Sequence, residues 1–107
     1  MTKSQQTLIN NEILNFIGYY NDMDEKPIRS ARLRTCSAVV TEYEHFYVLT
    51  SYRTNIAIID KDTDTLYDVL RYVYGYTSTS AQHIAKFRHD YGRGKWGCTR
   101  ELRYYPV

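Results

Sequence analysis

The spacing of apolar residues changes along this sequence, and this change limits the folds that the chain can adopt. Up to Tyr20 the apolar residues recur every three or four positions, as on one face of an amphipathic helix. This face comprises Leu8, Ile9, Ile13, Phe16, Ile17 and Tyr20. We therefore predict a helix from about Thr7 to Tyr20, with Gly18 near its end, followed by a polar and acidic loop, Asn21 to Pro27.

From Arg29 onward the pattern is that of strands. Residues 29–40 alternate imperfectly and predict a first strand. After a turn at residues 43–45, residues 46–52 predict a second strand. Residues 55–60 predict a third strand that is apolar enough to be central. Residues 61–64 (K-D-T-D) predict a hairpin turn, because Asp tolerates turn geometry and caps its own backbone.

The last third of the chain predicts one more helix between strands. Residues 65–74 are rich in β-branched and aromatic side chains and favour a strand, with a helical turn as the alternative. A second helix is expected near residues 79–91, because Thr79 and Gln82 have the spacing of a capping box. Residues 99–105 favour a final strand.

These elements predict an α+β fold. We expect an antiparallel sheet of about four to five strands with an N-terminal helix and a second helix near residues 79–91. A length of 107 residues corresponds to a single small domain, residues 1–107.

Tyrosine is unusually frequent: the chain has 12 Tyr residues against one Trp and three Phe. The Tyr ring is apolar and its hydroxyl is polar, which suits both half-buried sheet faces and binding surfaces. Two interpretations stay open, a Tyr-rich sheet and a recognition surface. A Tyr-rich strand at a sheet edge could also pair two copies, so both a monomer and a homodimer are compatible with the sequence.

The charge is nearly balanced, with 14 Lys and Arg against 12 Asp and Glu and a formal net charge of +2. This balance does not predict nucleic-acid binding from bulk charge, and it argues against a strongly acidic mimic of DNA.

The N-terminal residues 1–11 are polar and lack the apolar core of a signal peptide, and no apolar run approaches the roughly 18 residues of a membrane span. We therefore expect a cytosolic protein without membrane contact. Cys36 and Cys98 are expected to be reduced, with a disulfide between them as the alternative.

One acidic motif resembles a calcium loop. Asp60, Asp62 and Asp64 have the spacing that opens an EF-hand, but Thr65 occupies the glycine position and Arg71 the position of the bidentate Glu. A solvated hairpin turn is the better interpretation.

The other reactive side chains have no partners at the sequence spacing of a metal site or a catalytic site. His83 and His89 fall on different sides of the predicted helix, and neither has a metal-ligand partner at the usual spacing. Neither Cys36 nor Cys98 has an activating base nearby in sequence. The chain also lacks a P-loop and a G-x-G-x-x-G motif. We expect no enzymatic activity, no cofactor and no metal.

The C-terminal third carries the best candidate for a binding site. Residues 92–97 (G-R-G-K-W-G) combine glycines, two cations and the single Trp. Glycines let a partner approach the backbone, cations can meet phosphates or carboxylates, and an exposed Trp can stack on a base or fill a pocket. The candidate partner-binding residues are Arg88, Arg93, Lys95, Trp96, Arg100, Tyr104 and Tyr105. The alternative is a solvated turn with Trp96 folded back into the core. Arg29, Arg32 and Arg34 would extend the surface if they lie on the outward face of their strand.

A second pattern runs through the middle of the chain, over roughly residues 46–91. It consists of a strand ending in Ser-Tyr-x-Thr, an apolar strand, a Tyr, and a Ser/Thr-rich helix start leading to His-Ile-x-x-Phe. The matching residues are Ser51, Tyr52, Thr54, Ala57, Tyr67, Tyr76, Ser78, Thr79, His83, Ile84 and Phe87. This pattern resembles small uncharacterised proteins carried by phages and mobile elements of Gram-positive bacteria.

The motif itself has a structural interpretation. Tyr52 and Thr54 would set a strand edge or turn, Thr79 would cap the helix, and His83 would fix the preceding loop by a hydrogen bond.

The resemblance also implies a context. Small phage proteins without catalytic residues often block host machinery, and the anti-CRISPR proteins are the best-defined class. The expected function is therefore a phage-encoded inhibitor that binds a host CRISPR effector nuclease of type II in the host bacterial cytoplasm. The alternative is a nucleic-acid-binding accessory or regulatory protein of a phage, with DNA or RNA as its partner. A structural protein of the virion is a third option without specific support.

Overall fold

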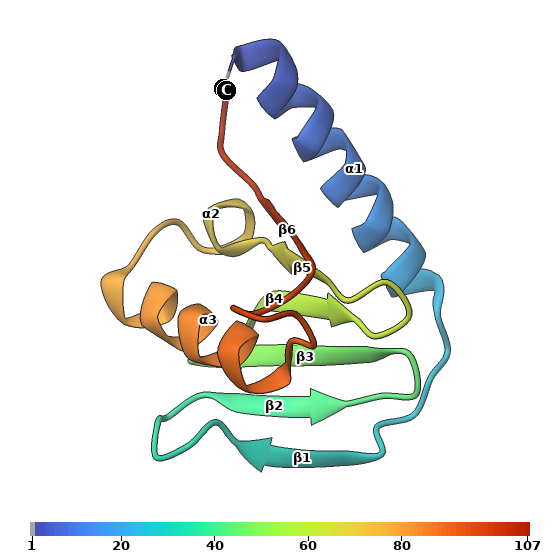
Figure 1. The fold of residues 1–107 in the computed structure, drawn as a ribbon, viewed down its shortest axis with the longest axis vertical. Coiled ribbons are helices and arrows are strands. Elements are labelled where there is room, and N and C mark those ends of the chain that lie inside the picture. The colour runs from blue at the N-terminus through green and yellow to red at the C-terminus, as the bar shows by residue number, and fades with distance from the viewer. Residues whose placement is uncertain (1) are drawn as a thin grey trace.

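The computed structural model describes residues 2–107. All its strands form a single sheet, and its helices lie against that sheet (Figure 1). The helices are α1 (Lys3–Asp22), α2 (Leu70–Val73) and α3 (Ser78–Tyr91), and the strands are β1 (Arg29–Arg32), β2 (Val39–Glu42), β3 (Phe46–Ser51), β4 (Thr54–Asp60), β5 (Thr65–Asp68) and β6 (Arg100–Arg103). The α+β class is confirmed, as is the second helix.

The six strands lie in the sheet in the order in which they occur along the chain. The predicted number of four to five strands is wrong because residues 29–40 form two strands rather than one. The chain reverses between them at Arg34, whose backbone has a left-handed φ of 55°. The N–H of Leu33 donates to the carbonyl of Ala38 at 2.9 Å, which closes this hairpin. Both residues are buried and fix the reversal in the core.

The sheet is not wholly antiparallel, which corrects a second part of the prediction. β6 runs parallel to β5, with Leu66 opposite Glu101 and Tyr67 opposite Leu102. Parallel neighbours require a long crossover connection, and the segment that contains α2 and α3 supplies it.

The predicted strand over residues 65–74 ends early. β5 stops at Asp68, whose side-chain Oδ1 accepts the N–H of Leu70 at 3.1 Å. This local hydrogen bond turns the backbone and begins the short helix α2. The alternative of a helical turn is therefore correct for the second half of this segment.

The helix starts also differ from the predicted ones. α1 begins at Lys3 because Thr2 and Gln5 form a capping box, and it continues past Gly18 to Asp22. Leu8, expected on the buried face, is 69% exposed. In α3 the N-cap is Thr77, whose hydroxyl accepts the N–H of Ser80 at 3.2 Å, so the predicted capping box of Thr79 with Gln82 is wrong.

Alternating side chains divide the core between the two faces of the sheet. Leu49 and Ile59 join Ile84 and Phe87 of α3 in one apolar cluster, and α3 lies across this face in Figure 1. Val48, Ile58 and Tyr67 face the opposite way and pack with Ile13 and Phe16 of α1. The rings of Phe16 and Tyr67 stack with their centroids 3.7 Å apart. Each face of the sheet is thus covered by one helix. None of the helices within residues 2–107 has both the length and the apolar character needed to cross a membrane.

The two edge strands of the sheet, β6 and β1, differ in what lies beside them. α1 lies along β6, where the side chain of Gln6 donates to the carbonyl of Arg103 at 3.0 Å. Asn10 donates to the carbonyl of Tyr105 at 2.6 Å and accepts the N–H of Tyr105 at 3.2 Å. Gln6 and Asn10 are buried, so two polar side chains of a helix satisfy the backbone of an edge strand and of the residues after it. β1 forms the other edge with the sequence R-S-A-R, so neither outer strand contains the Tyr residues that the sequence led us to expect at an edge.

We expect Asn10→Ala to lower the free energy of unfolding by about 1–3 kcal/mol, because the buried Asn10 side chain holds both backbone groups of Tyr105, just after β6, against α1. Chemical denaturation followed by circular dichroism measures this loss. Asn11→Ala, an exposed neighbour on the same helix, is the matched control. Equal stability of the two variants would show that the hydrogen bonds of Asn10 contribute nothing.

Candidate functional site

The loop between α3 and β6 presents Lys95 and Trp96 at its tip. α3 ends at Tyr91, and the N–H of Gly92 closes its last turn on the carbonyl of Arg88 at 3.0 Å. The N–H of Gly94 donates to the carbonyl of Gly97 at 2.7 Å, which narrows the loop below its tip.

Close backbone packing explains why glycine stands at the base of this loop. A Cβ atom on Gly92 would collide with the backbone of Gly97, and a Cβ atom on Gly94 would lie 2.8 Å from the carbonyl oxygen of Gly97. The glycines therefore serve the internal geometry of the loop, rather than the approach of a partner that the sequence suggested.

A buried carboxylate holds both ends of the loop. Asp64, 3% exposed, accepts the backbone N–H of Arg93 at 3.0 Å through Oδ1. Its Oδ2 accepts the backbone N–H and the hydroxyl of Thr99 at 2.8 and 2.7 Å. Burial acts to raise the pKa of Asp64, but the hydrogen bonds from Thr99 and Arg93 outweigh burial and hold the pKa below its usual range. The loop is thus fixed at its base by a charged group.

Trp96 points into solvent. Its side chain is 84% exposed, and the ammonium of Lys95 lies 5.5 Å from its ring centroid. The alternative of a Trp folded back into the core is wrong. A large aromatic ring with this exposure on a fixed loop can stack on another ring or insert into a pocket of a partner.

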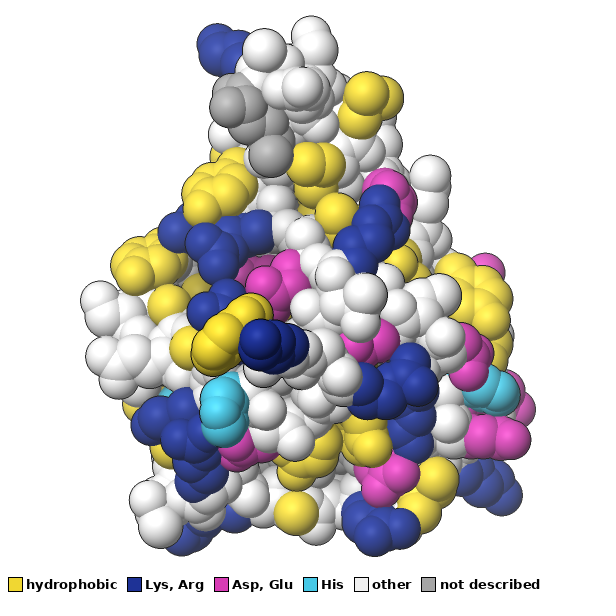
Figure 2. Space-filling view, viewed as in Figure 1, with side chains coloured by type: hydrophobic (Ala, Val, Ile, Leu, Met, Phe, Trp, Pro, Cys, Tyr) yellow, Lys and Arg dark blue, Asp and Glu magenta, His cyan; other side chains and the backbone are white. Residues whose placement is uncertain are grey.

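Most of the other predicted cations already have carboxylate partners. Arg100 forms two hydrogen bonds with Glu12, at 2.6 and 2.9 Å, and lies against α1. Arg88 lies 3.7 Å from a carboxylate oxygen of Glu101. Arg93 donates to the carbonyl of Lys61 at 2.6 Å. In Figure 2 the basic side chains accordingly form several small groups beside acidic ones, with no continuous basic stripe.

The structure does not bring all the predicted site residues together. Arg93, Lys95 and Trp96 lie in the loop after α3. Tyr104 follows the other end of β6 and packs against Tyr72 with ring centroids 5.1 Å apart. Between them, Arg88 of α3 and Tyr105 line one cavity.

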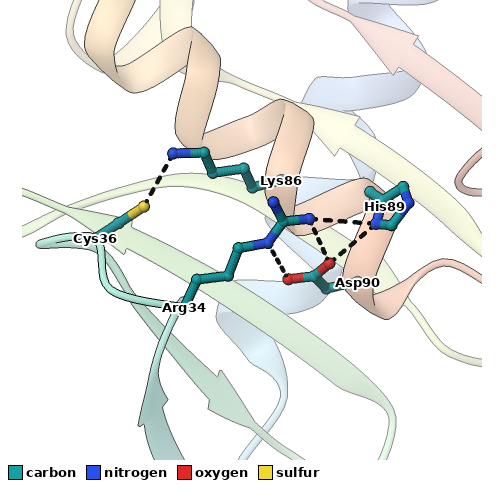
Figure 3. A network of polar contacts seen from close by, with 5 residues as sticks. All are labelled: Arg34, Cys36, Lys86, His89 and Asp90. Carbon is teal, nitrogen blue, oxygen red and sulfur yellow. Dashed lines mark hydrogen bonds and ion pairs between the residues drawn. The ribbon is translucent and has the colours of Figure 1, made fainter.

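One arginine of the first hairpin contacts α3. Arg34 donates two hydrogen bonds to Asp90, at 2.7 and 2.8 Å, and His89 also contacts Asp90 (Figure 3). The hydrogen bonds from Arg34 lower the pKa of Asp90 to about 2. In the same network Lys86 donates to the thiol of Cys36 at 3.2 Å. The network fastens the β1–β2 hairpin to α3. Arg29 and Arg32 lie on the far edge strand and do not extend the loop surface.

A buried Ser–His pair lies beneath the β3–β4 turn. Ser51 Oγ and His83 Nδ1 are 3.0 Å apart, and burial lowers the pKa of His83. Among residues 2–107 no carboxylate hydrogen-bonds to His83, and both residues are buried, so the pair lacks the orienting acid and the access of a catalytic dyad.

The turn above this pair is strained. Tyr52 and Arg53 both have left-handed φ angles, 50° and 69°, in a turn that usually requires Gly or Asn. The prediction that Tyr52 sets a turn is confirmed. His83 anchors the last residue of β3, rather than the loop before α3 that the sequence suggested.

Glu25, Glu44 and His45 are the residues that could hold a metal ion, since their ligand atoms lie within 4.8 Å of one another. Glu25 is, however, already bonded to both the backbone N–H and the ring of His45, each at 3.0 Å. The predicted hairpin turn at residues 61–64 is confirmed, and the N–H of Asp62 donates to Asp60 at 2.9 Å within it, but Asp64 is buried rather than solvated. Cys36 and Cys98 are free thiols, and burial raises the pKa of Cys98 to about 12.

Comparison with known proteins identifies no relative: no protein-family model, curated protein or solved structure matches this chain.

The sequence did not reveal the role of Asp64, which holds both ends of the loop that carries Lys95 and Trp96. The turn K-D-T-D was recognised, but the carboxylate of Asp64 bonds residues much later in the chain, and no local spacing signals this.

We expect Asp64→Asn to loosen the loop and to lower the free energy of unfolding by about 1–3 kcal/mol. The backbone of Asp64 is left-handed, with a φ of 52°, which Asn tolerates equally well, so the substitution chiefly replaces a charged acceptor. Amide hydrogen exchange at Arg93 and Thr99 should become faster. Asp62→Asn, an exposed change in the same turn, should leave both measurements unchanged.

The stability difference between the wild type and Asp64→Asn should depend on pH. The lowered pKa means that the carboxylate stabilises the fold above the unfolded value of about pH 3.9 and that this contribution is lost as the pH falls through the lower folded value. Denaturation curves from neutral pH down to acid should therefore converge. A constant difference would contradict a charged Asp64.

Proposed function

We propose that this chain is a non-catalytic binding protein that uses the Lys95–Trp96 tip to grip a macromolecular partner. The observation that carries the proposal is the 84% exposure of the single Trp, on a loop whose base is held by a buried carboxylate. Trp is enriched among the residues that dominate binding energy at interfaces. A loop that is ordered before binding also loses less conformational entropy on association.

The partner class that we propose is a host defence nuclease, so that the chain would be a phage-encoded inhibitor of the type II anti-CRISPR class. The resemblance to small phage proteins supports this class. The close pairing of Arg34 and Arg100 with carboxylates supports a protein partner at the loop, because few cations near it are left to follow a phosphate backbone. The inhibitor would act stoichiometrically in the host bacterial cytoplasm, by covering a surface that the nuclease needs for guide, target or motion.

The second candidate function is nucleic-acid binding by an accessory or regulatory protein of a phage. Lys95 has no carboxylate partner within the part of the chain that the structure describes, and Trp96 beside it offers a free ring face. A cation next to an exposed aromatic ring is a common arrangement for contacting single-stranded DNA or RNA.

The double variant Lys95→Ala/Trp96→Ala should weaken inhibition by at least about tenfold, the effect expected when a central aromatic contact is removed. The assay is target-DNA cleavage by a purified type II CRISPR nuclease with its guide, titrated with this protein before guide loading and after it. The matched control is Lys3→Ala/Leu8→Ala, which removes an exposed cation and an exposed apolar side chain from α1.

The outcomes separate the two candidates. Near-stoichiometric loss of cleavage, at salt that suppresses bulk DNA binding, supports the inhibitor. Inhibition of equal strength by the folded double variant would remove the loop as the site. Full cleavage with several such nucleases, together with oligonucleotide affinity that falls steeply with salt, would favour the nucleic-acid-binding protein.

A further inference from the structure

A second concave site lies where α2, α3 and β6 meet. Two adjoining cavities, of about 240 and 180 Å³, open there and share Asp68, Arg88 and Arg103 in their walls. Arg71 and Tyr76 also line one cavity, and Glu101 and Tyr105 also line the other, together with apolar side chains. We call this pair of cavities the arginine cleft. Each cavity is smaller than the roughly 300–1,000 Å³ of pockets for drug-sized ligands, so the arginine cleft suits a small anion or one group of a larger molecule.

Two tyrosine rings position one of its arginines. The guanidinium carbon of Arg71 lies 4.6 Å from the ring centroid of Tyr76 and 4.6 Å from that of Tyr105. A guanidinium held against aromatic faces keeps its N–H donors available in its own plane. Among residues 2–107 Arg71 forms no ion pair or hydrogen bond with a carboxylate, since nearby Asp68 pairs with Arg103 and feels Arg71 only through its charge. Arg71 is therefore a fixed cation whose donors are not used by an acid of the chain.

The other charges in the arginine cleft leave an excess of donors. Both carboxylate oxygens of Asp68 are engaged, one by the N–H of Leu70 and the other by Arg103, each at 3.1 Å. The ion pair between Arg88 and Glu101 is loose, at 3.7 Å. Arg71, Arg88 and Arg103 thus face only two carboxylates, Asp68 and Glu101, and the site retains a net positive charge.

We propose that the arginine cleft binds a phosphoryl group. A phosphoryl group offers three terminal oxygens in a tetrahedral arrangement, which can accept from guanidinium groups that converge from α2, α3 and β6. A carboxylate offers only two oxygens, both in one plane, and one guanidinium can engage both side by side, so it suits arginines from three directions less well. The number and the separate origins of the three arginines therefore favour the phosphoryl group over a carboxylate.

The arginine cleft adjoins the loop of the first site but does not depend on it. The aliphatic part of Arg88 packs near Gly97, so Arg88 lies between the two sites. The proposal does not require that the Lys95–Trp96 tip bind a nuclease, and variants of the two sites test the two ideas separately.

Calorimetric titration with inorganic phosphate, pyrophosphate, a nucleoside diphosphate and a short single-stranded oligonucleotide tests the proposal and identifies the source of the group. Succinate serves as the carboxylate probe. Side-chain N–H resonances of Arg71, Arg88 and Arg103 report the position of the bound anion. Arg71→Gln should weaken pyrophosphate binding by at least about tenfold, the loss expected for a charged bidentate contact. Arg32→Gln, on the opposite edge strand, should leave the affinity unchanged, as should Trp96→Ala.

Three results would overturn the proposal. The first is the absence of binding by all four phosphoryl probes at millimolar concentration. The second is equal affinity of the wild type and a folded Arg71→Gln variant for pyrophosphate. The third is tighter binding of succinate than of pyrophosphate, which would assign the arginine cleft to carboxylates. Loss of nuclease inhibition by the Trp96 variant with unchanged pyrophosphate binding would instead confirm that the two sites are separate.

Discussion

The carboxylate of Asp64 is the interaction on which the C-terminal half of the structure depends. Its side chain joins the start of β5 to both ends of the loop at residues 93–99, and its carbonyl accepts the N–H of Arg100 at 3.3 Å, where β6 begins. A single buried residue therefore positions the exposed Trp and starts the parallel pairing of β6. Because the group is charged and buried, removing its partners would be costly, which keeps this arrangement in one conformation.

Pairing of charges explains why the face shown in Figure 2 carries no continuous basic stripe, although the chain has 14 basic residues. Arg34, Arg100 and Arg103 are each bonded to a carboxylate from another element, and these contacts connect hairpin to helix, strand to helix and strand to strand. Such arginines hold elements together. Lys95 and Arg71 differ, because each lies beside aromatic rings and is bonded to no acid in the described chain. The two proposed binding sites use these cations.

Local signals predicted the helices and most strands, because apolar spacing and turn residues act over a few positions. The sequence could not show that the chain reverses at Arg34, since this left-handed residue stands where Gly or Asn is usual. The turn at Tyr52 was predicted from the Ser-Tyr-x-Thr pattern alone. The sequence could not show the direction of β6 either, because that follows from a long crossover. Of the candidate site, the loop and its Trp were predicted, whereas the role of Asp64 and the positioning of Arg71 depend on contacts between distant segments.

The unequal edges of the sheet limit how copies of this chain can associate. Gln6 and Asn10 of α1 occupy the outer side of β6 and of the residues after it, whereas the backbone of β1 has no strand beyond it. We therefore expect strand pairing between molecules at β1 rather than at β6. Two molecules that pair antiparallel through β1 would form a two-fold symmetric dimer whose remaining edges are both β6. A helix along one edge thus limits growth by strand addition as well as covering the core.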